Sequence, residues 1–245
     1  MANRSLLSNV EHHDLKFTAR WGAAFGDSVN QMLVLPTEFE DAQREYPIFF
    51  RRDEQGEYHA VVLLGFDREE NLFVGDDGWT TRYVPAVQRR GPFLIGGQAE
   101  AVDGAPGQPL IHVDLDDPRV GVHEAEPLFL PHGGHAPALN RVSEALRTLH
   151  SGMAAKAAMF AAFEDLQLIE KVAAEVTLND QKTYHLTSFH TLDEERFAAL
   201  SGDALDRLHR AGFLRLAVFA ISSLRNMGRL IELKNRKLAD SARQG

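Results

Sequence analysis

Hydrophobic and polar positions alternate in short runs along the first 130 residues, as is typical of β-strands separated by turns. Tyr46–Phe50 starts extended, because Pro47 disfavours helix at the residue before it. Tyr58–Phe66 returns after the turn Asp53–Gly56, which predicts a β-hairpin. Further strands are expected at 71–74, 93–95 and 110–115, with a loop rich in Gly and Pro at 102–109.

After Pro131 the hydrophobic residues recur every three or four positions, which predicts a helix from about 138 to 160. A hairpin at 175–178 and 184–189 is expected to interrupt the helices. Thr191–Glu194 fits a capping box for a short helix. Ser201 or Asp203 caps the next helix, which ends at Gly212, and a last helix is expected over about 213–238.

This order of elements predicts an α+β fold. Residues 1–130 form a β-rich N-terminal part with a small, mostly antiparallel sheet. Residues 131–245 form a helical C-terminal part with an inserted β-hairpin. A length of 245 residues suits one compact domain or two small ones, and both arrangements remain open.

Composition excludes several functional classes. The chain has no cysteine, so it has no disulfide, thiol nucleophile or cysteine metal site. The net charge of −9 argues against nucleic-acid binding. No G-x-G-x-x-G, P-loop or G-x-S-x-G motif occurs. The longest apolar run, Phe213–Leu224, is too short to span a bilayer, which takes about 20 residues. The polar N-terminus resembles no signal peptide. We therefore expect a soluble cytoplasmic protein, or one exported without a cleaved signal.

An ordered set of short motifs resembles the bacterial SapC family, whose name comes from an association with surface layers. The match extends from about Phe39 to Leu233. It comprises Glu38-Phe39, Tyr46–Phe50, Leu63–Gly65, Asn71–Phe73, Trp79, Tyr83–Ala86, Arg89–Phe93, Asp193–Phe197, Leu200, Gly212–Leu214 and Ser223-Leu224. The chain departs from the family at Gly91, where an aromatic residue is more common, and at His132–His135, where an acidic turn is expected. The resemblance implies no catalytic residues.

Four residues within these motifs form a candidate ligand-binding surface: Trp79, Tyr83, Arg89 and Arg90. Arginine pairs with carboxylates in a bidentate manner, and aromatic rings stack on planar groups. These residue types would therefore suit an anionic or aromatic ligand. The alternative is that they only stabilise the β-rich half, since large aromatic side chains bury much apolar area.

A second candidate site uses histidines. His112 and Asp114 lie two apart on a predicted strand and so share a face. One further histidine would complete a two-His-one-carboxylate set of the kind that holds ferrous iron; the candidates are His132, His135, His185 and His190. The alternative is that Asp114 serves the following turn and that the histidines lie at the surface.

The leading hypothesis is a SapC-like accessory or interaction protein without a catalytic centre or cofactor, which binds a protein partner or a second copy of itself. The last helix carries apolar residues on one side and could supply such a surface. The alternatives are an enzyme dependent on iron or another divalent metal, and a protein that binds a small anionic or aromatic ligand.

Overall fold

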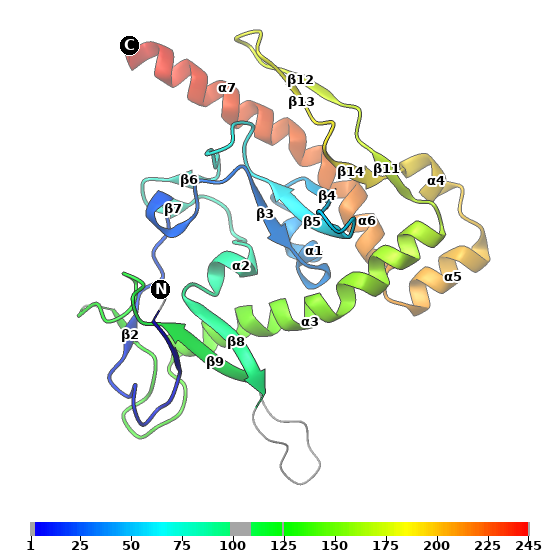
Figure 1. Cartoon of the computed structure of the whole chain (residues 1–245). Coiled ribbons are helices and arrows are strands. Elements are labelled where there is room, and N and C mark those ends of the chain that lie inside the picture. The colour runs from blue at the N-terminus through cyan, green and yellow to red at the C-terminus, as the bar shows by residue number, and fades with distance from the viewer. Residues whose placement is uncertain (1–2, 99–108, 124, 245) are drawn as a thin grey trace. The chain divides into compact units, whose positions relative to one another are not determined.

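Figure 1 shows a computed structural model that describes residues 3–98, 109–123 and 125–244. The chain divides into two compact units, neither of which is one continuous segment. Unit 1 comprises 1–20 and 86–150, and unit 2 comprises 21–85 and 151–245. Chain continuity through the long helix α3 (Pro137–Asp165) links them, since its first half lies in unit 1 and its second half in unit 2.

Unit 1 is built on a three-stranded antiparallel sheet in which β9 lies between β1 and β8. Its strands and its short helix are β1 (Arg4–Leu6), β2 (Lys16–Phe17), α2 (Ala86–Arg89), β8 (Phe93–Gln98), β9 (Pro109–Asp114) and β10 (Glu126–Pro127). The core packs Phe93 and Val113 against Leu139 and Val142 of α3. Phe17 contacts Phe93 edge to face at 5.1 Å between ring centroids.

Unit 2 contains a five-stranded antiparallel sheet in the order β11-β14-β4-β5-β3. The strands are β3 (Gln31–Val34), β4 (Ile48–Arg52), β5 (Tyr58–Leu63), β11 (Ile169–Lys171) and β14 (His190–Leu192). Alternation along β4 separates the two faces. Phe50 packs against Phe160 and Phe163 of α3. Phe49 points to the opposite face, where it meets Phe189 at 5.2 Å.

The remaining elements of unit 2 are short except for three helices. They are η1 (Ala23–Phe25), η2 (Pro36–Glu38), α1 (Phe39–Ala42), β6 (Val74–Gly75), β7 (Gly78–Trp79), β12 (Glu175–Thr177), β13 (Thr183–His185), α4 (Glu194–Ala198), α5 (Gly202–Arg210), α6 (Leu214–Ser223), η3 (Leu224–Asn226) and α7 (Met227–Gln244). The β12–β13 hairpin lies beside α7 (Figure 1), and the Asn179 amide N–H donates to Asn235 of that helix at 2.9 Å.

The predicted α+β class is confirmed, and several element boundaries need correction. The helix expected over 213–238 is two helices joined by the 3₁₀ turn η3. The side chain that caps α4 belongs to Asp193, because Thr191 is drawn into β14 by pairing. Residues 71–74 form mainly a turn rather than a strand. Residues 102–108 of the expected loop at 102–109 lie outside the described residues, and Pro109 begins β9.

The boundary expected between residues 130 and 131 falls inside unit 1. Long-range strand pairing explains this, because β1 pairs with β9 and β14 pairs with β4. In the part of the chain that the structure describes, no helix is both long and apolar enough to cross a membrane. The apolar run at 213–224 instead forms α6, whose Ala217, Ala220 and Ser223 are buried.

Candidate functional site

The predicted ligand residues Trp79 and Tyr83 use their polar atoms on carboxylates of unit 2. The indole Nε1–H of Trp79 donates to Asp27 at 2.9 Å, and the Tyr83 hydroxyl donates to Glu38 at 2.6 Å. Asp27 and Glu38 are both 1% exposed. These contacts tie the 79–83 segment to the segment that leads into α1.

Arg89 and Arg90 belong to unit 1, whereas Trp79 and Tyr83 belong to unit 2. Arg89 is the last residue of α2. The guanidinium of Arg90 donates to the backbone carbonyl of Phe93 at 2.9 Å. Burial lowers the pKa of Arg90, and the nearby positive charges of Arg119 and Arg4 lower it further. The contact to Phe93 joins the end of α2 to the start of β8.

His112 and Asp114 share one face of β9 in unit 1, as the sequence indicates. Gly96 crosses directly over the His112 ring, since a Cβ at Gly96 would lie 2.6 Å from His112 Nδ1. Asp114 accepts a hydrogen bond from the backbone N–H of Asp116 at 3.2 Å. The carboxylate thus caps the turn that follows β9.

The other candidate ligands are spread over both units. His132 is exposed in a turn, and His135 pairs with Phe129 through a β-bridge. In unit 2, His185 contacts Glu175 at 3.0 Å, and His190 packs edge to face on Tyr58. Across the described residues, no three His, Asp or Glu side chains are grouped so that they could hold a metal ion. The predicted metal site therefore has no third ligand there.

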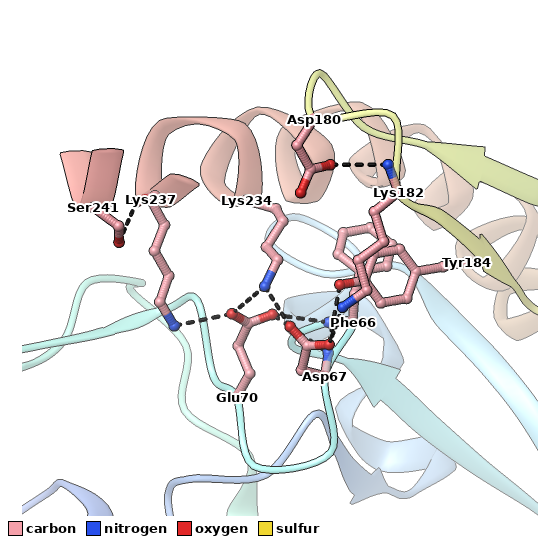
Figure 2. Close-up of polar contacts among 9 residues, drawn as sticks. All are labelled: Phe66, Asp67, Glu70, Asp180, Lys182, Tyr184, Lys234, Lys237 and Ser241. Carbon is pink, nitrogen blue, oxygen red and sulfur yellow. Dashed lines mark hydrogen bonds and ion pairs between the residues drawn. The ribbon is translucent and has the colours of Figure 1, made fainter. Parts of the chain in front are cut away.

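A cluster of charged groups in unit 2 brings three distant segments together (Figure 2). We call it the ion-pair cluster; it consists of Asp67, Glu70, Lys182, Tyr184, Lys234 and Lys237. The ammonium group of Lys234 on α7 donates to Asp67 at 2.6 Å and to Glu70 at 2.8 Å. Lys182 and Tyr184 of the hairpin each donate to Asp67 at 3.0 Å. Lys237 donates to Glu70 at 2.9 Å.

The centre of the ion-pair cluster is removed from water, because the side chains of Lys234 and Glu70 are only 6% and 4% exposed. Burial acts to raise the pKa of Glu70, but hydrogen bonds from Lys234 and Lys237 outweigh it, so the pKa lies below its usual value. Burial likewise acts to lower the pKa of Lys234, and hydrogen bonds to Asp67 and Glu70 leave it raised. Both groups are therefore charged over the neutral pH range.

These shifts decide what the ion-pair cluster can do chemically. A lysine that serves as a nucleophile or base needs a lowered pKa, and a carboxylic acid that donates a proton near neutral pH needs a raised one. Lys234 and Glu70 are shifted in the opposite directions. The geometry instead suits a structural role, in which α7 and the hairpin are held against the loop that follows β5.

Sequence reasoning did not find the ion-pair cluster. Its signal was present, since Lys234 and Lys237 are three apart on a helix and therefore share one face. Asp67 and Glu70 also lie three apart, in a tight turn where the Glu70 carboxylate accepts from the backbone N–H of Phe66 at 3.1 Å. Which carboxylates the lysines meet depends on the tertiary fold.

Comparison with known proteins gives one match. No curated protein and no solved structure is significantly similar to the chain. The profile of the SapC family matches residues 7–230 of the 245, and this range includes the motifs that carry the resemblance. It also includes most of the ion-pair cluster, with only Lys234 and Lys237 beyond its end. The chain therefore belongs to the SapC family.

Proposed function

We propose that this SapC-family chain is an accessory protein, which works by binding a partner protein rather than by catalysing a reaction. The observation that carries the proposal is the ion-pair cluster and what it holds. A buried ion pair seldom adds stability compared with apolar packing, and in some proteins it instead specifies one geometry. Here Lys234 fixes α7 against the loop that follows β5, and the β12–β13 hairpin is attached to the same Asp67 through Lys182 and Tyr184.

The side of the hairpin that faces away from this anchor is polar and exposed. We call it the outer face; it consists of Glu175, Thr177, Thr183 and His185. Side chains alternate along the strands, so Val176 is buried while both its neighbours are exposed. The hydroxyl oxygens of Thr177 and Thr183 lie 3.1 Å apart across the two strands. A fixed row of hydroxyl, carboxylate and imidazole groups is suited to hydrogen bonding with another protein at little entropic cost.

Site-directed crosslinking tests this proposal. Thr183 is replaced by photoreactive benzoylphenylalanine, and the full chain is irradiated in the cells that naturally make it. The matched control carries the same group at Arg210, an exposed position on α5. The family's association with surface layers makes surface-layer components the first partners to look for.

We expect a discrete crosslinked protein from position 183 and none from position 210. Charge reversal at Glu175→Lys should weaken that crosslink, because Glu175 belongs to the same face. Equal crosslinking at both positions, or none at position 183, would count against the outer face. Turnover of a small molecule by the purified chain would contradict the accessory role itself.

A further inference from the structure

A pocket of about 200 Å³ lies on the face of the five-stranded sheet that Phe49 shares, entirely within unit 2. Its lining comes from Asn30 and β3, from β4, β5 and the loop after β5, and from β13 and the segment between β13 and β14. Its lining residues include Asn30, Gln31, Arg51, Phe66, Tyr184 and Phe189. The pocket adjoins the ion-pair cluster, because Tyr184 belongs to both and Phe66 in the pocket lining is the residue before Asp67.

One wall of the pocket carries a cation that lacks an acidic partner. Arg51 lies on the same face of β4 as Phe49, and its guanidinium lies 5.7 Å from the centre of the Phe189 ring. Within the described residues no carboxylate pairs with Arg51. Arginine presents a rigid fork of N–H donors that matches a carboxylate. This wall therefore suits an anionic group.

A second wall contains an acceptor without a donor. Oε1 of Gln31 is buried and makes no hydrogen bond within the described residues. A buried polar atom in this state costs free energy that a ligand N–H or O–H would recover. The side-chain amide of the neighbouring Asn30 likewise makes no hydrogen bond among those residues.

Aromatic rings supply the apolar part of the lining. Phe66 and Tyr184 pack together at 5.1 Å between centroids, and Phe189 is supported from beneath by Phe49. Rings held in this way offer edges and faces to a planar ligand. The position of the Tyr184 ring is also fixed in advance, since its hydroxyl donates a hydrogen bond to Asp67.

We infer that this pocket binds a small aromatic carboxylic acid whose ring carries a hydroxyl or amino donor. The carboxylate pairs with Arg51, the ring packs among Phe66, Tyr184 and Phe189, and the donor bonds to Gln31. This site differs from the surface predicted at Trp79, Tyr83, Arg89 and Arg90. It shares one residue, His185, with the outer face of the hairpin.

Two-dimensional NMR titration of the full chain tests the site, with 4-hydroxybenzoate and 3-hydroxybenzoate as probes up to about 10 mM, the range in which ligands of this size bind. We expect saturable shifts confined to the pocket residues. Arg51→Gln should weaken binding about tenfold or more, because it removes the charged fork. Arg52→Gln is the matched control, since Arg52 points to the opposite face and contacts Glu164. It should change affinity by less than about twofold.

A second pair of measurements separates the two polar contacts. Gln31→Met should weaken the binding of 4-hydroxybenzoate about threefold to tenfold. It should leave the affinity for benzoate unchanged, because benzoate has no donor for Gln31. 4-Hydroxybenzamide, which lacks the charge, should bind more weakly than the acid to the original chain. The inference would be overturned if neither hydroxybenzoate bound saturably. Equal losses from Arg51→Gln and Arg52→Gln in folded proteins would overturn it as well.

Discussion

Lys234 shows how strongly one buried charge can depend on its neighbours. It reaches two carboxylates, and one of them, Glu70, is itself almost fully buried. Replacement of Lys234 by Met should lower the free energy of unfolding by about 3–5 kcal/mol, because Glu70 then loses its buried partner. Urea denaturation followed by circular dichroism measures this.

The control for Lys234→Met is Lys237→Met. Lys237 contacts the same oxygen of Glu70, but its side chain is 56% exposed. Exposed ion pairs contribute little, so we expect a loss below about 1 kcal/mol. Similar losses for the two variants would show that burial does not set the strength of the ion-pair cluster.

Gln31 gives a prediction of opposite sign. Its buried carbonyl oxygen makes no hydrogen bond among the described residues, and Met has a similar size without that polar group. Gln31→Met should therefore raise the free energy of unfolding of the unliganded chain by about 1 kcal/mol. The exposed turn residue Gln55 is the control, and Gln55→Met should change stability by less than about 0.5 kcal/mol. A loss of stability in Gln31→Met would indicate that the amide is satisfied by water.

Two helical glycines test packing at the level of elements. In a helix interior, glycine to alanine commonly stabilises by up to about 1 kcal/mol. Gly228 of α7 has open space around it, so Gly228→Ala should follow that rule. Gly152 of α3 behaves differently, because a Cβ there would lie 2.5 Å from the Cβ of Leu35. Leu35 is 1% exposed and has little room to move.

For Gly152→Ala we expect destabilisation by about 1–3 kcal/mol, the usual cost of overpacking a core. Thermal and urea denaturation of both variants, side by side with the original chain, measure the difference in sign. Stabilisation by Gly152→Ala would mean that α3 can shift away from the segment before η2 at little cost.

The stability of the whole molecule should depend on pH, with different titrating groups acting in successive pH ranges. Burial lowers the pKa of His59 and of His190 below the usual value of 6.5. A lowered histidine pKa means that the unfolded chain binds protons first, so stability falls as pH drops below about 6.5. Hydrogen bonds from Lys234 lower the pKa of Asp67, and the pKa of Glu70 is also below its usual value. Stability contributed by these carboxylates is lost as pH falls below their usual values of 3.8 and 4.5.

At alkaline pH one contribution comes from Lys234, whose pKa is raised above its usual value of 10.5. Its contribution is complete below that value and is lost as pH rises through the pKa of the folded state. Urea midpoints measured from pH 3 to pH 10 should therefore be highest above the histidine range. Glu70→Gln should flatten the decline between about pH 4.5 and pH 3 and leave the histidine step in place. An unchanged acid decline would contradict the assignment to Glu70.

Local pattern was enough to predict much of the chain. Pro47 and the Asp53–Gly56 turn placed the β4–β5 hairpin, and the spacing of apolar residues after Pro131 placed α3. The hairpin expected at 175–178 and 184–189 is present as well, although its second strand ends at His185. Of the two caps expected for α5, Ser201 and Asp203, the structure has Ser201. Each of these depends on residues close together in the chain, whose preferences act without help from the rest of the fold.

How distant segments combine depends on the folded chain as a whole. An α+β chain of the SapC family could be predicted beforehand, because turns, periodicity and ordered motifs are local properties. The sequence did not reveal that β14 pairs with β4, that Lys234 meets Asp67 and Glu70, or that Gln31 and Arg51 line one pocket. Each of those contacts joins residues that are at least 20 positions apart. Such pairing is selected by burial and complementary charge in the whole fold, since no local preference encodes the partner.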